Sequence, residues 1–225
     1  MQLTVIIPTL NEAACISATL MPLQALRARG HEVIVVDGGS VDATVTQALP
    51  LCDRVLNSAP GRARQMNAGA QAATGEVLWF VHADTDVPVD SDFLIQQALQ
   101  GDPLWGRFDV RLSGRQPLLR IVAWLMNLRS RITGIATGDQ GIFVKRAVFT
   151  AVGEFPDIPL MEDIALSRAL KQHAHPICLR TRLVTSSRRW ERDGIVRTIL
   201  LMWWLRFAYW RGVSPKRLAA HYQHG

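Results

Sequence analysis

The sequence offers little with which to cross-link itself or to bind zinc through cysteine. Its three cysteines, Cys15, Cys52 and Cys178, are far apart and form no C-x-x-C pair. This spacing argues against both a zinc cluster and a disulfide framework, and the odd number favours a reducing compartment. We therefore expect a cytoplasmic protein.

Long hydrophobic runs are also missing. The longest apolar stretch covers residues 199–205 and ends at Arg206, well short of the ~20 residues needed to span a bilayer. The apolar run at residues 3–8 is short and has no basic leader, so we expect no signal peptide. The prediction is a soluble protein, or a peripheral one at the inner face of the membrane.

Two common nucleotide-binding signatures are absent. No G-x-G-x-x-G follows the first apolar run, and no G-x-x-x-x-G-K-[ST] occurs in the chain. These absences argue against a dinucleotide site and exclude a P-loop at the level of sequence. Phosphate would then be held by a metal ion and by basic residues. Arg62 and Arg64 are candidates because two arginines at a helix start oppose the helix dipole, although a solvated surface would also explain them.

Positive charge is concentrated in the second half of the chain. The 25 Lys and Arg outnumber the 19 Asp and Glu, giving a net charge of +6. Residues 1–100 hold 5 basic and 10 acidic side chains, whereas residues 101–225 hold 20 basic and 9 acidic ones. This asymmetry indicates an anionic partner: nucleic acid, a membrane surface or a phosphorylated small molecule.

Short runs rich in valine and isoleucine alternate with helical patterns. This order predicts an α/β protein with a parallel sheet covered on both faces. The expected strands cover residues 3–7, 32–37, 54–56, 77–83, 105–112, 141–144 and 176–183. The expected helices cover residues 13–26 (with Asn11 as N-cap), 41 onward, 62–73, 117–128, 161–172, 195–210 and 215 onward. We expect one main domain, residues 1–190, with C-terminal aromatic and basic helices, residues 191–225, packed on it.

Polar segments follow three of the predicted strands, at residues 8–12, 37–42 and 84–86. In open parallel sheets ligands bind outside the carboxyl ends of the strands, although turn chemistry alone would favour the same residue types. Asp84 and Asp86 follow a buried strand that would hold them rigidly, and such carboxylates suit Mg²⁺ or Mn²⁺. A second D-x-D pair, Asp90 and Asp92, fits a helix N-terminus instead. We expect His82 to fill space rather than to bind metal.

Adjacent carboxylates, Glu162 and Asp163, open a predicted helix. They complement the helix dipole, which is common. The alternative is that one of them points into the cleft as a general base for an acceptor hydroxyl.

Together these segments resemble family 2 glycosyltransferases of the GT-A fold. The resemblance covers roughly residues 1–190 and is carried, in order, by residues 8–12, 37–40, 64–69, 84–86 and 162–163. Residues 105–110, 134–140 and 156–163 further resemble a bacterial subfamily assigned to arsenosugar biosynthesis. The fold implied is a mostly parallel, Rossmann-like sheet covered by helices.

The resemblance also implies roles for individual residues. Asp163 would be the catalytic base, with Glu162 beside it, and Asp86 would bind a divalent cation, Mn²⁺ or Mg²⁺, with Asp84 at the ribose or the metal. The nucleotide-sugar donor would be contacted by Pro8, Thr9, Glu12, Asp37, Gly39, Arg64, Asn67 and Asp84. The acceptor or diphosphate side would be formed by Gly138, Asp139, Gln140, Arg189 and Trp190. Arg189-Trp190 resembles the end of the Q-x-x-R-W motif of processive members, but Ser186 stands at the glutamine position.

The activity implied is inverting, metal-dependent transfer of a sugar, a hexosyl group, to a hydroxyl of a small-molecule or lipid-linked acceptor. Two alternatives stay open from the residues: a nucleotidyltransferase, and a non-catalytic nucleotide-sugar-binding or membrane-associated scaffold. The region 177–225 holds 10 basic and 2 acidic residues and several tryptophans. Three interpretations account for this composition: helices that pack on the core, contact with an anionic membrane or a second copy of the chain, and binding of nucleic acid. The order of the motifs argues against nucleic acid.

Overall fold

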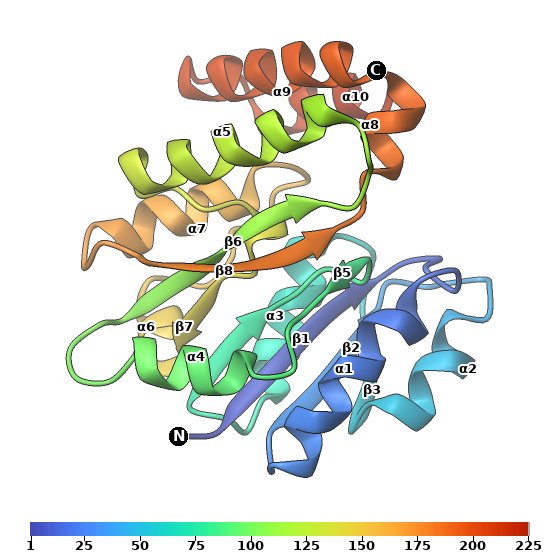
Figure 1. Cartoon of the computed structure of the whole chain (residues 1–225), viewed down its shortest axis with the longest axis vertical. Helices are drawn as coiled ribbons and strands as arrows, with labels where there is room; N and C mark the ends of the chain where they lie inside the picture. Colours follow the sequence, from blue (N-terminus) through green and yellow to red (C-terminus); the bar gives the residue numbers. More distant parts are fainter. Residues whose placement is uncertain (225) are drawn as a thin grey trace.

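The structure is a computed structural model that describes the backbone of residues 1–224 and the side chains of residues 1–222 (Figure 1). The strands are β1 (Leu3–Thr9), β2 (Glu32–Asp37), β3 (Arg54–Asn57), β4 (Val77–Phe80), β5 (Thr85–Asp86), β6 (Trp105–Leu112), β7 (Phe143–Lys145) and β8 (Ile177–Thr185). The helices are α1 (Ile16–Ala28), α2 (Thr44–Ala48), α3 (Arg62–Ala72), α4 (Ser91–Ala98), α5 (Pro117–Thr133), α6 (Arg146–Ala151), α7 (Glu162–Lys171), α8 (Arg188–Asp193), α9 (Ile195–Trp210) and α10 (Pro215–His224). Two 3₁₀ turns, η1 (Leu49–Leu51) and η2 (Gly138–Gln140), complete the chain.

The strands form one mixed sheet in the order β3-β2-β1-β4-β7-β6-β8-β5. Strands β1 to β4 are parallel to one another, whereas β7 is antiparallel to both of its neighbours. Strand β6 runs parallel to β8, and the short β5 closes the edge antiparallel to β8. The parallel part places the carboxyl ends of β1, β2 and β4 at one edge of the sheet, where α/β proteins bind ligands.

Helices cover both faces of the sheet, as the continuous apolar strands predict. Because successive side chains of a strand point to opposite faces, Val5 and Ile7 pack with α1 and α4, whereas Ile6 packs with α3, α6 and α7. Trp79 lies on the first face and Phe80 on the second, each completely or almost completely buried. The predicted α/β fold with a mostly parallel sheet is confirmed.

The last three helices add a further layer at one end of the molecule. Helix α9 lies beside α5 in Figure 1, and Ile195 and Ile199 of α9 pack against Val122 of α5. Leu205 of α9 and Leu218 of α10 are completely buried against the start of α7. No helix among residues 1–224 is long and apolar enough to cross a bilayer.

Several element boundaries differ from the sequence prediction. Helix α1 begins at Ile16 rather than near residue 13, and Asn11 is not its N-cap. Asn11 instead has a left-handed backbone, and its Oδ1 accepts a hydrogen bond from the backbone N–H of Val41 at 2.9 Å. Asparagine tolerates this conformation because its side chain bonds locally.

Two further boundaries differ from the prediction. Strand β4 ends at Phe80 rather than at residue 83, so residues 81–84 form a loop at the sheet edge. Helix α5 continues past residue 128 to Thr133 and ends at Gly134, which has a positive φ.

Helix α3 approaches the sheet closely at Gly69, which suggests a stability test. A β-carbon there would lie 2.5 Å from Cγ2 of the buried Ile6. In an open helix Gly→Ala gains about 1 kcal/mol, whereas overpacking a core costs about 1–3 kcal/mol. Because Val36, also buried, would lie 3.1 Å from the same carbon, we expect the cost at the upper end of this range. Gly69→Ala should then lower the free energy of unfolding in urea by a net of about 1–2 kcal/mol. Gln71→Ala, exposed on the same helix, should leave it nearly unchanged. An equal or more stable Gly69→Ala protein would contradict this packing.

Candidate active site

A cavity of about 430 Å³ opens at the carboxyl edge of the sheet. Residues from both halves of the chain form its wall. It is lined by Pro8, Thr9, Leu10, Glu12, Gly61, Arg62, Gln65, His82, Ala83, Asp84, Asp139, Thr185, Ser186, Arg189, Trp190, Thr198, Met202 and Tyr222. The ends of β1 and β4 supply one side, and helices α8, α9 and α10 supply the other. The C-terminal helices are therefore part of the cavity wall.

Two carboxylates at this edge share one arginine. Nη2 of Arg188 lies 3.1 Å from Oε2 of Glu12 and 3.6 Å from Oδ2 of Asp84. The thiol of Cys15 donates to the same Glu12 oxygen at 3.0 Å, and burial together with this acidic partner raises the pKa of Cys15 to about 12. The thiol therefore stays protonated at neutral pH, which argues against a nucleophilic role for Cys15.

The start of α3 contributes Gln65, which hydrogen bonds hold in place, and the cation Arg62 to the cavity wall. Gln65 is buried, and its Nε2 donates to the backbone oxygens of Thr9 at 2.7 Å and Val36 at 2.8 Å, which ties the ends of β1 and β2 together. Arg62 extends into the cavity. Removal from bulk water opposes its charge, but the carboxylates of Glu162 and Asp139 are among the groups that raise its pKa above the ordinary value.

Asp37 at the end of β2 organises the next loop. One carboxylate oxygen accepts hydrogen bonds from the backbone N–H groups of Gly39 and Ser40 at 2.9 and 2.8 Å, and the other accepts one from the Ser40 hydroxyl. Gly39 has a φ of 97°, a conformation that favours glycine. Neither Asp37 nor Gly39 lines the cavity, and both shape the loop beside it.

Arg64 and Asn67 face away from the cavity. The guanidinium of Arg64 bonds the carboxylate of Asp157 at 2.9–3.0 Å, with both side chains more than half exposed. Asn67 exchanges two hydrogen bonds with the backbone of Phe155, at 2.8 and 3.1 Å. These residues hold the loop that precedes α7.

The η2 turn brings a further carboxylate to the cavity. Oδ1 of Asp139 lies 3.4 Å from Nδ1 of His82. Burial alone would raise the pKa of Asp139, but its contact with His82 and the charges of Arg62 and Arg206 hold this pKa below the ordinary value. A β-carbon at Gly138 would lie 2.4 Å from Nε2 of His82, so a larger residue there would have to displace the imidazole. His82 therefore packs against η2 and contacts its Asp139.

The adjacent carboxylates at the start of α7 lie in different environments. Oδ2 of Asp163 accepts the backbone N–H of Gly138 at 2.8 Å, and its Oδ1 accepts that of Ile164 at 2.7 Å. These donors stabilise a negative charge on Asp163. Glu162 is buried. Burial and the neighbouring charge of Asp163 raise the pKa of Glu162, although Arg62 acts in the opposite direction.

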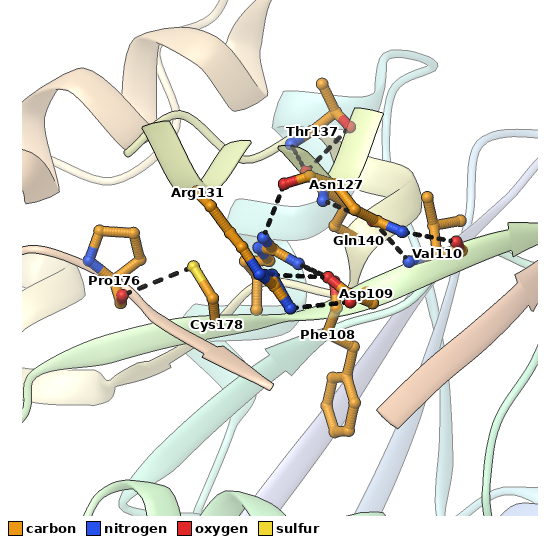
Figure 2. Close-up of polar contacts among 10 residues, drawn as sticks. Phe108, Asp109, Val110, Asn127, Arg131, Thr137, Gln140, Pro176 and Cys178 are labelled. Atoms are coloured by element: carbon orange, nitrogen blue, oxygen red, sulfur yellow. Dashed lines mark hydrogen bonds and ion pairs between the residues drawn. The ribbon is translucent and has the colours of Figure 1, made fainter. Parts of the chain in front are cut away.

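A buried polar network supports η2 from behind (Figure 2). Gln140, which is completely buried, forms a capping box with Thr137 and donates to Oδ1 of Asn127 at 3.4 Å. Asn127 in turn exchanges two hydrogen bonds with the backbone of Val110, both of 2.9 Å. Gln140 therefore anchors the turn that carries Asp139 and does not reach the cavity.

The structure gathers some of the predicted site residues and separates others. Pro8, Thr9, Glu12, Asp84, Asp139, Arg189 and Trp190 line the cavity. Asp163 bonds to Gly138, the neighbour of Asp139 in η2, and Glu162 lies next to Asp163 at the start of α7. Asp86 is exposed on β5 outside the lining, and Asp37, Gly39, Arg64, Asn67 and Gln140 act on the surrounding loops.

Several residues of the site were not predicted from the sequence. Arg188 pairs with Glu12 and Asp84. Its neighbours Arg189 and Trp190 were the one signal that pointed to this segment. Thr198, Met202 and Tyr222 carry no motif, and only the packing of α9 and α10 brings them to the cavity.

Comparison with known proteins decides the family. Residues 4–131 match the model described as Glycosyl transferase family 2. The chain belongs to glycosyl transferase family 2. A Mycobacterium bovis PGL/p-HBAD biosynthesis glycosyltransferase is 29% identical over 170 residues, which cover 68% of this chain and 62% of that protein. A Staphylococcus aureus poly-beta-1,6-N-acetyl-D-glucosamine synthase is 24% identical over 78% of this chain and 47% of its own length. The chain thus spans less than two thirds of these family 2 relatives.

Solved structures place the family 2 chain in the GT-A fold. S. aureus TarS in complex with UDP-GlcNAc superposes with a TM-score of 0.68 at 19% identity, covering 83% of this chain and 58% of TarS. A Pyrobaculum calidifontis mannosyltransferase in complex with GDP-Man and Mn²⁺ gives 0.63 at 23% identity, covering 81% and 56% of the two chains. The expected family 2 membership and the expected GT-A fold are confirmed.

The raised pKa of Glu162 predicts a pH-dependent gain in stability on substitution. Above the ordinary value of 4.5 the unfolded chain loses the Glu162 proton more readily than the folded one, so this side chain destabilises the fold at neutral pH. Below that value both states are protonated and the effect disappears. We expect Glu162→Gln to raise the free energy of unfolding near pH 7, with the gain shrinking toward about pH 4.

Urea denaturation at both pH values measures this difference. Glu76→Gln, at an exposed position, is the matched control and should change stability little at either pH. A Glu162→Gln protein that is less stable than the wild type at neutral pH would contradict the assignment.

Proposed function

We propose that this family 2 glycosyltransferase moves a sugar from a nucleotide-sugar donor to an acceptor hydroxyl with inversion at the anomeric carbon. The observation that carries the proposal is the cavity at the carboxyl edge of the sheet, where Asp84 and Glu12 face arginines and the carboxylates of α7 lie close by. The UDP-GlcNAc and GDP-Man complexes of TarS and the mannosyltransferase support a donor of this class.

The donor nucleoside occupies the side of the cavity formed by Pro8, Thr9 and Glu12. The loop shaped by Asp37 and Gly39 lies next to this side and limits the space for the nucleoside. Arg64 and Asn67 do not contact the donor directly. They hold the loop at residues 155–157 through Asp157 and Phe155. Arg62 and Arg189 supply positive charge toward the diphosphate, for which planar guanidinium groups are suited.

The donor set at the sheet edge fits a divalent cation. Magnesium and manganese commonly use one or two carboxylates together with oxygens of substrate phosphates. Asp84 at the cavity and Asp86 on β5 supply two carboxylates, and residues 1–222 contain no cluster of three side chains suited to hold a metal alone. Asp86 and Asp84 would hold the cation, which would supply positive charge beside the departing diphosphate. Asp84 would then have to give up its ion pair with Arg188.

The proton chemistry falls to one of the two α7 carboxylates. Asp163, whose charge is stabilised by two backbone donors, removes the proton from the acceptor hydroxyl. As the proton leaves, the acceptor oxygen forms its bond to the anomeric carbon and the bond from that carbon to the diphosphate breaks. Glu162 lies buried beside this base, and burial together with the charge of Asp163 raises the pKa of Glu162.

The proposal extends to the acceptor, the biosynthetic role and the location of the enzyme. The acceptor meets the enzyme near Gly138, Asp139 and Trp190, and it is a small molecule or a lipid-linked hydroxyl. Arsenosugar biosynthesis remains a prediction from residues 105–110, 134–140 and 156–163, as does a cytoplasmic location with peripheral contact to the inner face of the membrane. The mycobacterial and staphylococcal relatives are biosynthetic glycosyltransferases by name, which agrees with a biosynthetic role.

Replacing the base tests the mechanism. We expect Asp163→Asn to reduce turnover of the nucleotide sugar by at least ~100-fold, because general-base catalysis contributes that much, while donor affinity is kept. Release of the nucleoside diphosphate measures turnover, and calorimetry measures affinity. Asp102→Asn, in an exposed turn, is the matched control. Turnover in Asp163→Asn equal to that of the control would remove Asp163 from the role of base.

Metal binding tests Asp84 and Asp86 without relying on activity. We expect Asp84→Asn and Asp86→Asn each to weaken Mn²⁺ binding in the presence of a nucleoside diphosphate by at least about tenfold. Asp90→Asn, in the other D-x-D pair, should bind as the wild type does. Manganese electron paramagnetic resonance reports the free ion directly. Unchanged affinity in Asp86→Asn would exclude this residue from the ligand set.

A further inference from the structure

A second pocket adjoins the candidate active site and is built differently. It has a volume of about 280 Å³ and lies between α5 and α9. Asp139, Trp190 and Met202 line both this pocket and the active-site cavity, so the two are neighbours with a shared wall. The remaining lining is apolar apart from two arginines: Val122, Leu125, Met126, Arg129, Ile199, Trp203 and Arg206.

The two arginines are placed where a cation is costly. Nε and Nη2 of Arg129 are buried, and within residues 1–222 no group accepts a hydrogen bond from either atom. Burial, together with the nearby charge of Arg206, lowers the pKa of Arg129 to about 9. Burial also lowers the pKa of Arg206, against the opposing effect of Asp163 and Asp139. The buried guanidinium atoms of Arg129 that lack an acceptor destabilise the fold, and Arg206 adds a second positive charge beside them. This arrangement points to an anion supplied from outside.

The pocket opens onto two exposed apolar stripes. Ile121, Leu125, Leu128 and Ile132 follow one another along α5 at spacings of three and four residues. On α9 the same spacing relates Val196, Leu200, Trp203, Phe207 and Trp210, all more than half exposed. Such spacing places each set on one face of its helix. Helices α5 and α9 lie side by side (Figure 1). Leu125 of one stripe and Trp203 of the other both line the pocket, so the stripes flank its mouth.

An arginine-rich groove continues this surface on the other side of α5. Its volume is about 680 Å³, and Trp124 stands in it with 60% of its surface exposed. The groove is lined by the arginines at positions 111, 120, 131, 180 and 182, against the single carboxylate of Asp109. Oδ2 of Asp109 already accepts from Arg131 at 2.8 Å (Figure 2), and Arg107 is its second partner. The groove therefore keeps an excess of positive charge.

We propose that the acceptor is a membrane lipid whose phosphate-bearing head also carries the hydroxyl that receives the sugar. Its phosphate binds between Arg129 and Arg206, and its hydrocarbon lies along the apolar stripes. This proposal rests on the proposed function, since it names the acceptor class for that transfer. Guanidinium pairs bind phosphate through charge-assisted hydrogen bonds, and apolar helix faces bordered by arginine bind anionic lipid surfaces. The shared wall at Asp139 leads the lipid head toward the carboxylates of α7.

Charge complementarity decides for a lipid over a second copy of the chain. A two-fold contact through the stripes would bring each arginine groove near its own copy, and like charges repel. An anionic bilayer instead attracts the arginines while its hydrocarbon covers the exposed tryptophans.

Vesicle flotation tests the proposal with phosphatidic acid as the probe. We expect the wild-type chain to float with phosphatidylcholine vesicles that contain phosphatidic acid, more than with vesicles brought to the same surface charge by phosphatidylserine. Arg129→Gln should weaken binding to the phosphatidic acid vesicles by at least about tenfold. Arg180→Gln also removes one positive charge, but from the arginine-rich groove and not from the pocket. This variant should keep the preference for phosphatidic acid. Inorganic phosphate with pure phosphatidylcholine vesicles should produce no flotation.

A second pair of variants tests the apolar stripes independently of charge. Phe207 on α9 and Phe93 on α4 are exposed to 59% and 56%, and only Phe207 belongs to a stripe. Phe207→Ser should reduce flotation several-fold, whereas Phe93→Ser should not. No preference for phosphatidic acid in the wild type, the same preference in Arg129→Gln, or equal effects of the two phenylalanine variants would each overturn the proposal.

Nucleotide-sugar binding, measured on the same samples without vesicles, separates this inference from the proposed function. A wild-type chain that binds donor but not phosphatidic acid vesicles would refute the lipid acceptor alone. A chain that floats with the vesicles but binds no donor would refute the transfer, and with it the acceptor role, while leaving the lipid site in place. Melting curves of Arg129→Gln confirm that the variant is folded.

Discussion

Electrostatic repulsion among carboxylates at the carboxyl edge of the sheet is the constraint on which the site depends. Glu12 and Asp84 follow neighbouring parallel strands, and Asp139, Glu162 and Asp163 reach the same region from later in the chain. Like charges this close destabilise one another unless cations stand between them. Arg188 lies between Glu12 and Asp84, and the charge of Arg62 is balanced by Asp139 and the α7 pair.

Part of this compensation comes from the basic second half of the chain. Arg188 and Arg189 both belong to α8, which follows β8. Arg188 pairs with Glu12 and Asp84, and Arg189 lines the cavity. In the proposed function, a cation held by Asp84 and a diphosphate beside Arg188 would add charge of both signs to this balance. Under the two proposals, the net positive charge serves phosphate groups of the donor and of a lipid rather than nucleic acid.

Much of the fold could be predicted because local rules agree with the final packing. The valine- and isoleucine-rich strands β1, β2 and β4 are buried on both faces, and their order with α1 and α3 is the usual order of a parallel sheet. Asn11 could not be predicted in the same way, because its role is a hydrogen bond to Val41, thirty residues away. Arg64 and Asn67 matched a motif, yet their partners Asp157 and Phe155 are visible only in the folded chain. The two arginines behind the second pocket likewise carry no sequence motif, since α5 and α9 meet only through tertiary packing.

The central claim is that the cavity at the sheet edge binds a nucleotide-sugar donor together with a divalent cation. A thermal-shift screen of UDP-, GDP- and other nucleotide sugars, each with and without Mn²⁺, tests it most directly. The account predicts that at least one of them raises the melting temperature, and that Mn²⁺ enlarges this shift while Mn²⁺ alone has little effect. If no nucleotide sugar shifts the melting temperature under either condition, the account of the site is contradicted.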